Sequence, residues 1–242
     1  METSREEVVL IRPKSHPFVK GVAAAVPIMI GYLPIGITFG LLAKQAGLTL
    51  YELTAMSAFV FAGASQFMAA NMIAVGIGVV EIIVATFILN FRHFIMSLSL
   101  MNALKVIPFQ FKLSMSFGLT DETFALSSMN AEKANEEKSH FFYGGLILAS
   151  YLTWVFGSFL GGLVGEFIPQ ALSQSMTIAL YVMFIALLVP SVKKEWRFGI
   201  IAFISMIFNY GFSQFLTSGW SIVLATLLGG CSGIFLMRGE EK

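Results

Sequence analysis

Residues 20–43 read KGVAAAVPIMIGYLPIGITFGLLA, and after Lys20 this stretch carries no charged side chain. As a helix with a rise of 1.5 Å per residue it would be about 36 Å long, and the hydrocarbon core of a bilayer is about 30 Å thick. The whole 242-residue chain has the same character, because 57% of its residues are hydrophobic and 12% are charged. Soluble domains contain about 45–50% apolar and about 25% charged residues. The sequence therefore predicts an all-α integral membrane protein and excludes a soluble enzyme.

The charged residues separate the apolar stretches and so indicate where membrane segments begin and end. They are concentrated in residues 1–20, 131–140 and 193–197. Because a membrane span needs about 20 apolar residues, we expect helices near residues 20–43, 53–80, 141–165, 167–192, 198–216 and 217–237. These segments predict a polytopic helix bundle in the cytoplasmic membrane.

Residues 82–131 allow two interpretations. The stretch 82–104 is long enough to span but has Arg92 near its middle, and the stretch 113–131 contains Asp121 and Glu122. The bundle has eight segments if both stretches span the membrane, and six if they form a re-entrant pair. Both counts put the N-terminus and the basic residues near span ends on the cytoplasmic side, as the positive-inside rule requires. These basic residues are Arg12, Lys14, Lys20, Lys193, Lys194, Arg197 and Arg238.

A faint internal repeat suggests two related halves. At an offset of 122 residues, Gly40-Leu41-Leu42 corresponds to Gly162-Leu163-Val164. Transporters built from two repeats bind substrate between them, although two apolar hairpins can also match by composition alone. We expect a single transmembrane domain over residues 1–242, divided into a cytoplasmic N-terminal segment (1–20), a first half (21–130), a polar connector (131–140) and a second half (141–242).

The first predicted helix contains Pro27 and Pro34, which lie seven residues apart and therefore on one helix face. Each proline removes the backbone donor for the carbonyl four residues earlier. The carbonyls released in this way could line a polar path at Pro34. The alternative is a kinked structural helix whose neighbours satisfy these carbonyls.

Residues 61–67 read FAGASQF, an island of small and polar residues in the second predicted helix. A break at Gly63 would expose the amides of Ala64, Ser65 and Gln66 at a half-helix N-terminus, beside Phe67. Such a terminus is favourable for a carboxylate. The alternative is close helix packing, which we expect for the glycine pairs elsewhere. These pairs are Gly36/Gly40, Gly157/Gly161 and Gly229/Gly233.

The segment from Asn90 to His93 places a guanidinium in the middle of an apolar stretch. A charge at this depth costs about 2.5–3.5 kcal/mol on insertion scales unless it is paired or hydrated. Asp121 and Glu122 are the natural partners of Arg92, and a hairpin would bring one of them to it. His93, Asp121 and Glu122 are also candidates for proton coupling. The alternatives are an ion pair that only fixes the hairpin and an interfacial turn in which Arg92 is hydrated.

Other kinds of function lack a sequence pattern. The net charge is +1, the single cysteine excludes an intrachain disulfide, and the three histidines are scattered. Nucleotide-binding loops, nucleophile elbows and zinc-protease motifs are absent from the sequence. We therefore expect no catalytic residue, no cofactor, no metal site and no nucleic acid partner. Uphill transport would then use an ion gradient or a partner.

The chain resembles the AzlC family of branched-chain amino acid permeases. The resemblance covers residues 27–43, Ala46-Gly47-Leu48, Met56-Ser57, residues 61–67, Asn90-Phe91-Arg92-His93 and residues 120–125. It continues more weakly through the second half. Where the family has Pro-Phe-Gly in helix one, this chain has Pro34-Ile35-Gly36, a difference that bears on pocket size.

The resemblance implies a secondary transporter that exports leucine, isoleucine, valine or related hydrophobic amino acids. It also implies a lipid-embedded chain paired with a small AzlD-like membrane subunit. A zwitterion needs donors, acceptors and an apolar slot. The amides of residues 63–66 or Arg92 would bind its carboxylate. Asp121 or Glu122, with carbonyls of the first helix, would bind the ammonium group, and Phe61, Phe67 and Met68 would border the aliphatic side chain. A small-solute or ion channel and a non-transporting scaffold subunit are the alternatives.

Overall fold

The computed structural model describes residues 16–135, 138–165, 185 and 188–237, and within these ranges the chain is helical without a strand. The helices are α1 (Pro17–Gln45), α2 (Leu50–Val60), α3 (Gly63–Ala74), α4 (Val79–Ala103), α5 (Phe109–Phe117), α6 (Asp121–Met129), the 3-10 helix η1 (Ala131–Asn135), α7 (Ser139–Val164), α9 (Arg197–Phe212) and α10 (Ser218–Met237). Residues 188–194 are helical as well. Most of the predicted span 167–192, and residues 1–15 of the N-terminal segment, lie outside the described ranges.

Four of these helices are long and apolar enough to cross a membrane: α1, α4, α7 and residues Gly219–Leu236 of α10. The predicted helices at 20–43, 141–165 and 217–237 are thereby confirmed, and the stretch 82–104 is one full-length helix, α4. The prediction of an all-α, polytopic membrane protein is therefore correct.

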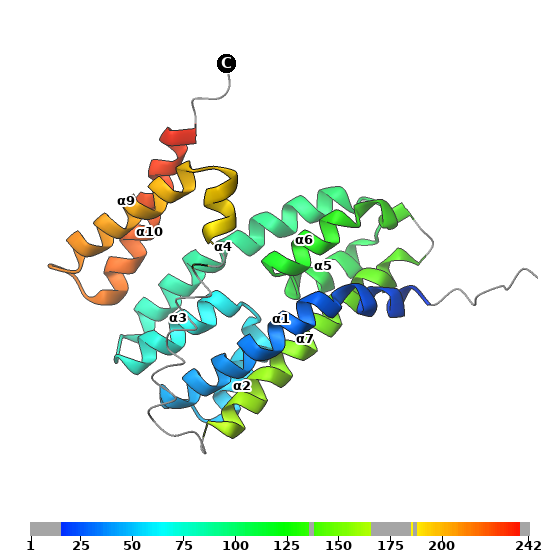
Figure 1. Ribbon diagram of the computed structural model, residues 1–242, viewed down its shortest axis with the longest axis horizontal. Helices are drawn as coiled ribbons and strands as arrows, with labels where there is room; N and C mark the ends of the chain where they lie inside the picture. Colours follow the sequence, from blue (N-terminus) through cyan, green and yellow to red (C-terminus); the bar gives the residue numbers. More distant parts are fainter. Residues whose placement is uncertain (1–15, 136–137, 166–184, 186–187, 238–242) are drawn as a thin grey trace, which may run out of the picture.

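The helices α1 and α7 lie side by side and run parallel (Figure 1). Glycine makes this approach close, since a Cβ on Gly36 would lie 3.1 Å from the Trp154 carbonyl oxygen and one on Gly40 would lie 2.7 Å from the Gly162 nitrogen. The two helices begin at residues 17 and 139, which differ by the 122 residues of the predicted repeat. The expected packing role of the glycine pairs in α1 and α7 is confirmed.

The predicted span 53–80 is not one helix. It is divided at Phe61, whose left-handed backbone (φ 41°, ψ 49°) ends α2, and α3 begins two residues later. The start of α2 contacts Gly162 near the end of α7, and the carbonyl oxygen of Ala58 accepts a hydrogen bond from Tyr151 in the middle of α7. From this break α3 returns along α1 to the region of Gln45. Residues 50–74 therefore form a hairpin that enters and leaves at the C-terminal ends of α1 and α7.

The predicted helix 113–131 is also wrong as a single element, because α5 ends at Phe117 and α6 begins at Asp121. A capping box, in which Thr120 and Thr123 bond each other's backbone N–H, begins α6 and explains the break. Phe111 lies against His140 at the start of α7, and the hydroxyl of Tyr143 bonds the carbonyl of Asn130 just after α6. This second hairpin therefore enters and leaves at the N-terminal ends of α1 and α7. The stretch 82–104 is one full-length helix and 113–131 belongs to this hairpin of two short helices, so neither two spans nor a re-entrant pair describes residues 82–131.

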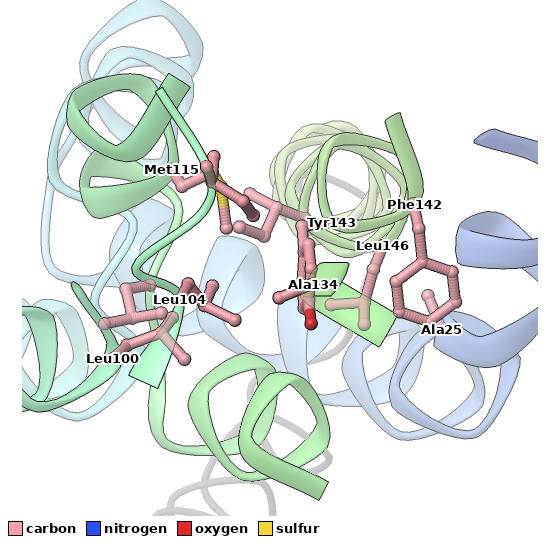
Figure 2. Close-up of a cluster of buried hydrophobic side chains, with 11 residues drawn as sticks. Ala25, Leu100, Leu104, Met115, Ala134, Phe142, Tyr143 and Leu146 are labelled. Atoms are coloured by element: carbon pink, nitrogen blue, oxygen red, sulfur yellow. The ribbon is translucent and has the colours of Figure 1, made fainter. Parts of the chain in front are cut away.

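A buried apolar cluster fastens the second hairpin to the long helices. Figure 2 shows Leu100 and Leu104 from the end of α4, Met115 from α5, and Tyr143 and Leu146 from α7 converging. Each of these side chains is less than 8% exposed. The cluster packs the second hairpin and the end of α4 against α7.

The helices α9 and α10 form an antiparallel pair that packs on α4 (Figure 1). Gly229 lies against Ser205 and Gly233 against Ile201, so the third glycine pair also serves packing. At the start of α10, Thr217 donates a hydrogen bond to Glu81 in the first turn of α4. The helices α4 and α10 therefore run in the same direction.

Candidate functional site

The tips of the two hairpins meet at Tyr32, a 6% exposed residue in the middle of α1. Its hydroxyl donates a 2.6 Å hydrogen bond to Glu122 Oε2 and lies 2.6 Å from Thr120 Oγ1, both at the tip of the second hairpin. Its ring makes edge-on contacts with Phe61 at 6.3 Å and Trp154 at 5.4 Å between centroids. Since Phe61 is the residue at which the first hairpin turns, Tyr32 joins the two tips.

The predicted partner of Arg92 is present. Its Nη1 lies 2.7 Å from Asp121 Oδ2, and the two side chains are 35% and 38% exposed. Asp121 therefore pairs with Arg92 while Glu122 pairs with Tyr32, so the two neighbouring carboxylates have separate roles. The cluster combines one guanidinium with two carboxylates, and both carboxylates stand in the first turn of α6, where the helix dipole favours negative charge.

Several buried polar atoms on α4 and α6, the helices that carry this cluster, have no hydrogen-bond partner among the described residues. They are Arg92 Nε, Asn90 Oδ1 and Ser127 Oγ. Leaving a buried polar group unpaired costs about 1–3 kcal/mol, so such atoms are rare in native proteins. A polar ligand or water at this depth would satisfy them. His93 follows Arg92 on α4 and is half-buried.

The predicted break at Gly63 is confirmed, since α3 begins there with Ala62 as an N-cap that has no side-chain hydrogen bond. The first-turn amides of Gly63, Ala64 and Ser65 have no acceptor within the helix. The amide of Gln66 was expected to be free as well, but it bonds the Ala62 carbonyl oxygen at 3.0 Å.

The side chain of Gln66 is fully buried and holds the first hairpin together. Its Oε1 accepts from the Ala62 amide at 3.1 Å and from Trp154 Nε1 at 3.0 Å, and its Nε2 donates to Ser57 Oγ at 3.0 Å. The Ser57 hydroxyl in turn donates to Ser158 on α7. The amide therefore ties α2, α3 and α7 to one another across the break.

Pro34 lies apart from this centre, whereas Phe67 is part of the buried apolar cluster that contains Tyr32, Phe61 and Trp154. Pro34 is exposed on α1, which continues as a helix through both of its prolines. Phe67 is buried against Phe39, with ring centroids 5.5 Å apart. The structure thus brings residues 61–66, Arg92, Asp121 and Glu122 around Tyr32 and Trp154, but not Pro34, and Asn90 lines a hollow with Phe87, Phe91 and Phe94 of its own helix.

Sequence reasoning missed Tyr32, Thr120 and Trp154. Tyr32 and Trp154 are aromatic residues with a polar end in otherwise apolar helices, and buried hydroxyl and indole groups usually have a partner. Thr120 followed by two acidic residues is a helix N-cap pattern and would have predicted a helix start at Asp121.

An apolar cavity of about 470 Å³ lies between the two hairpins along α7. The end of α2 contributes Ala58 and Phe59, α5 contributes Phe111 and Phe117, and α7 contributes Ile147 and Leu148. This hollow is an open groove, since Phe59 and Phe117 in its lining are 89% and 80% exposed, and it runs beside both tips without Arg92, Asp121 or Glu122 in its lining.

The sequence pattern that defines the family described as "AzlC protein" matches residues 27–168, more than half of the chain. The chain belongs to the AzlC family. The matched residues include both hairpins and the centre around Tyr32.

The relatives include proteins of bacteria and archaea. An uncharacterized membrane protein of Archaeoglobus fulgidus is 36% identical over 182 residues, which are 74% of this chain and 78% of the relative. The inner membrane protein YgaZ of Escherichia coli is 29% identical over 187 residues, 76% of each chain. The branched-chain amino acid transport protein AzlC of Bacillus subtilis is 25% identical over 207 residues, 84% of this chain and 80% of the relative. No solved structure matches this AzlC-family chain.

Proposed function

We propose that this AzlC-family protein exports leucine, isoleucine, valine or related hydrophobic amino acids across the cytoplasmic membrane. The observation that carries the proposal is the cluster of Arg92, Asp121 and Glu122 between two opposed hairpin tips in the middle of the bundle. Charged groups at this depth are costly and mark substrate or ion pathways. The Bacillus subtilis relative is named a branched-chain amino acid transport protein.

The chemistry of an amino acid fits the groups around this centre. Its carboxylate would bind the uncapped amides of residues 63–65 at the start of α3, or the free Nε of Arg92. Its ammonium group would bind Glu122 or Asp121, because the cluster has one more carboxylate than cation. Its branched side chain would lie in the neighbouring apolar cavity.

The energy for export would come from an ion gradient. Asp121, Glu122 and His93 are the candidates for carrying a proton, since they are the titratable groups at or beside the centre. A small AzlD-like membrane protein would be the partner, as the family resemblance implies. We propose a transporter and not an enzyme, because the charged groups of the centre suit a zwitterion and do not form a recognisable pair of nucleophile and base.

Efflux measurements test this proposal. Cells would be preloaded with dipeptides of leucine, isoleucine or valine, and the intracellular amino acid would be followed with the chain expressed alone and beside its small partner. We expect faster, saturable loss that Arg92→Gln and Asp121→Asn reduce at least tenfold. The matched controls are Lys105→Gln and Glu132→Gln, which change exposed charges away from the centre and should leave efflux unchanged.

Normal efflux by Arg92→Gln and Asp121→Asn at normal membrane levels would overturn the proposed site. Flux that neither saturates nor shows counterflow would indicate a channel. If the chain is present in the membrane but changes the level of none of these amino acids, either alone or beside its small partner, the scaffold alternative is favoured.

A further inference from the structure

Tyr32 contacts both hairpin tips through different parts of its side chain. The hydroxyl bonds Thr120 and Glu122 of the second hairpin, and the ring lies against Phe61 of the first. The two hairpins enter the bundle from opposite ends, so their tips are joined here near mid-depth. A change at the hydroxyl therefore reaches the first hairpin through one rigid ring.

The direction of the two hydrogen bonds follows from the chemistry of the groups. A carboxylate only accepts, so the single phenolic proton of Tyr32 points to Glu122 Oε2. The hydroxyl proton of Thr120 is then the one that lies between Thr120 Oγ1 and the Tyr32 oxygen. Both Glu122 Oε2 and Thr120 Oγ1 can also accept from an alkylammonium group, which has three N–H donors and no acceptor.

A ligand can reach this pair of oxygens from the side of Glu122, which is exposed, whereas Thr120 and Tyr32 are 7% and 6% exposed. The bonds from the Tyr32 phenol and from an ammonium ion to Glu122 are both charge-assisted, but only the ammonium ion brings a full positive charge of its own to the carboxylate. The ammonium group would therefore displace the Tyr32 hydroxyl from Glu122.

We propose that the Tyr32 hydroxyl occupies, in the empty protein, the place at Glu122 and Thr120 that the ammonium group of the substrate takes. The displaced Tyr32 ring gives up its contact with Phe61, which keeps its ring contact with Tyr151 on α7, and the turn at the tip of the first hairpin is loosened. Phe61 is suited to this role because its left-handed backbone is unfavourable for a residue with a Cβ and depends on the surrounding contacts. This inference rests on the proposed function. It names the Tyr32 hydroxyl as the group whose displacement by the substrate opens the centre.

The first test compares Tyr32→Phe with the wild-type chain. Purified full-length protein in detergent would be titrated with radiolabelled leucine, and competition would give the affinities of leucinamide, which has the amine, and 4-methylpentanoate, which lacks it. Tyr32→Phe keeps the ring but removes the competitor at Glu122. Because hydrogen bonds to charged groups are worth about tenfold in binding, we expect leucine and leucinamide to bind about tenfold more tightly and 4-methylpentanoate to bind as before.

Tyr143→Phe is the matched control. Tyr143 is a buried tyrosine of α7 whose hydroxyl bonds the carbonyl of Asn130 and lies away from Glu122. Its loss should leave the affinity for leucine unchanged. In the double variant Tyr32→Phe/Glu122→Gln the gain should disappear, because the amide removes the charge for which the hydroxyl and the ammonium group compete.

A second measurement keeps Tyr32 in place. Cys231 is the single cysteine of the chain, so Cys231→Ser with Ala62→Cys puts one thiol at the first hairpin tip, where Ala62 is 1% exposed. Leucine and leucinamide should raise the rate of alkylation by N-ethylmaleimide at least fivefold, and 4-methylpentanoate should not.

The outcomes separate the two levels of the argument. Wild-type protein that binds no leucine would contradict the proposed function. If the wild-type protein binds leucine, three results would contradict this inference alone. The first is a Tyr32→Phe affinity for leucine that is unchanged or weaker, and the second is an equal gain in affinity for 4-methylpentanoate. The third is an alkylation rate at Ala62→Cys that leucinamide leaves unchanged.

Discussion

Replacement of Gly40 by alanine tests the packing on which both hairpins depend. A Cβ at this position would lie 2.7 Å from the Gly162 nitrogen and closer still to the Ser158 carbonyl oxygen, both on the backbone of α7. Ordinary contact begins near 3.4 Å, so α1 and α7 would have to separate by at least 0.7 Å. The obstacle is backbone, which cannot rotate away as a side chain can.

The magnitude follows from two opposed effects. Alanine is about 0.8–1 kcal/mol more favourable than glycine within a helix, whereas overpacking costs about 1–3 kcal/mol and reaches the upper end against rigid backbone. Gly40→Ala should therefore lower the free energy of unfolding by about 1–2 kcal/mol. Gly31→Ala, on the same helix, is the control. A Cβ at Gly31 meets no atom of another element within 4 Å. This substitution should stabilise the protein slightly.

Thermal unfolding of the purified protein in detergent measures this difference. The two variants should differ by about 2–3 kcal/mol, so at about 2–4 °C per kcal/mol for a chain of this size we expect Gly40→Ala to melt about 4–12 °C below Gly31→Ala. A Gly40→Ala protein that melts at or above Gly31→Ala would refute the reasoning, because α1 and α7 would then not be in backbone contact.

Two further predictions concern the hairpin tip and the start of α7. Gln66→Leu leaves the Ala62 amide and Trp154 Nε1 without their acceptor, each at a cost of about 1–3 kcal/mol, so the melting temperature should fall. The exposed control Gln214→Leu should melt at the wild-type temperature. Equal melting temperatures of the two variants would contradict the role of the Gln66 side-chain amide. Lys138→Asn should stabilise the protein by about 1 kcal/mol. The N-cap of α7 has a left-handed backbone (φ 58°) that asparagine adopts more readily than lysine, and asparagine can bond the first-turn amides. A melting temperature below that of the wild type would contradict this prediction.

The glycine contacts also bear on the scaffold alternative. A scaffold subunit would hold its partner through closely packed glycine faces, and Gly36 and Gly40 form such a face in the sequence. In the structure both lie against α7 of the same chain. Enlarging either residue should therefore destabilise this chain itself, and a partner would have to bind elsewhere.

The sequence was sufficient for those features that depend on local composition. The sequence left residues 82–104, which form α4, open between two interpretations, but long apolar runs predict α1, α7 and α10, because every charge placed in lipid adds its own cost. The pairing of Arg92 with a carboxylate of the next helices was predictable for the same reason. The small residues around Gly63 also indicated correctly where a helix breaks.

The depth and direction of the broken helices were decided by tertiary structure. Residues 53–80 and 113–131 are each long enough to span, and composition alone did not indicate that the chain turns back at Phe61 and before Thr120. These turns depend on contacts from distant segments, such as the bond of Trp154 to Gln66 and the bond of the Tyr32 hydroxyl to Glu122.

The assignment of the two carboxylates is likewise a tertiary result. Asp121 and Glu122 are neighbours and are chemically equivalent in the sequence. In the structure Asp121 pairs with Arg92 of α4 and Glu122 with Tyr32 of α1. Consecutive residues in a helix point about 100° apart, so the helices on either side of α6 determine which carboxylate holds the guanidinium and which one is left for a ligand.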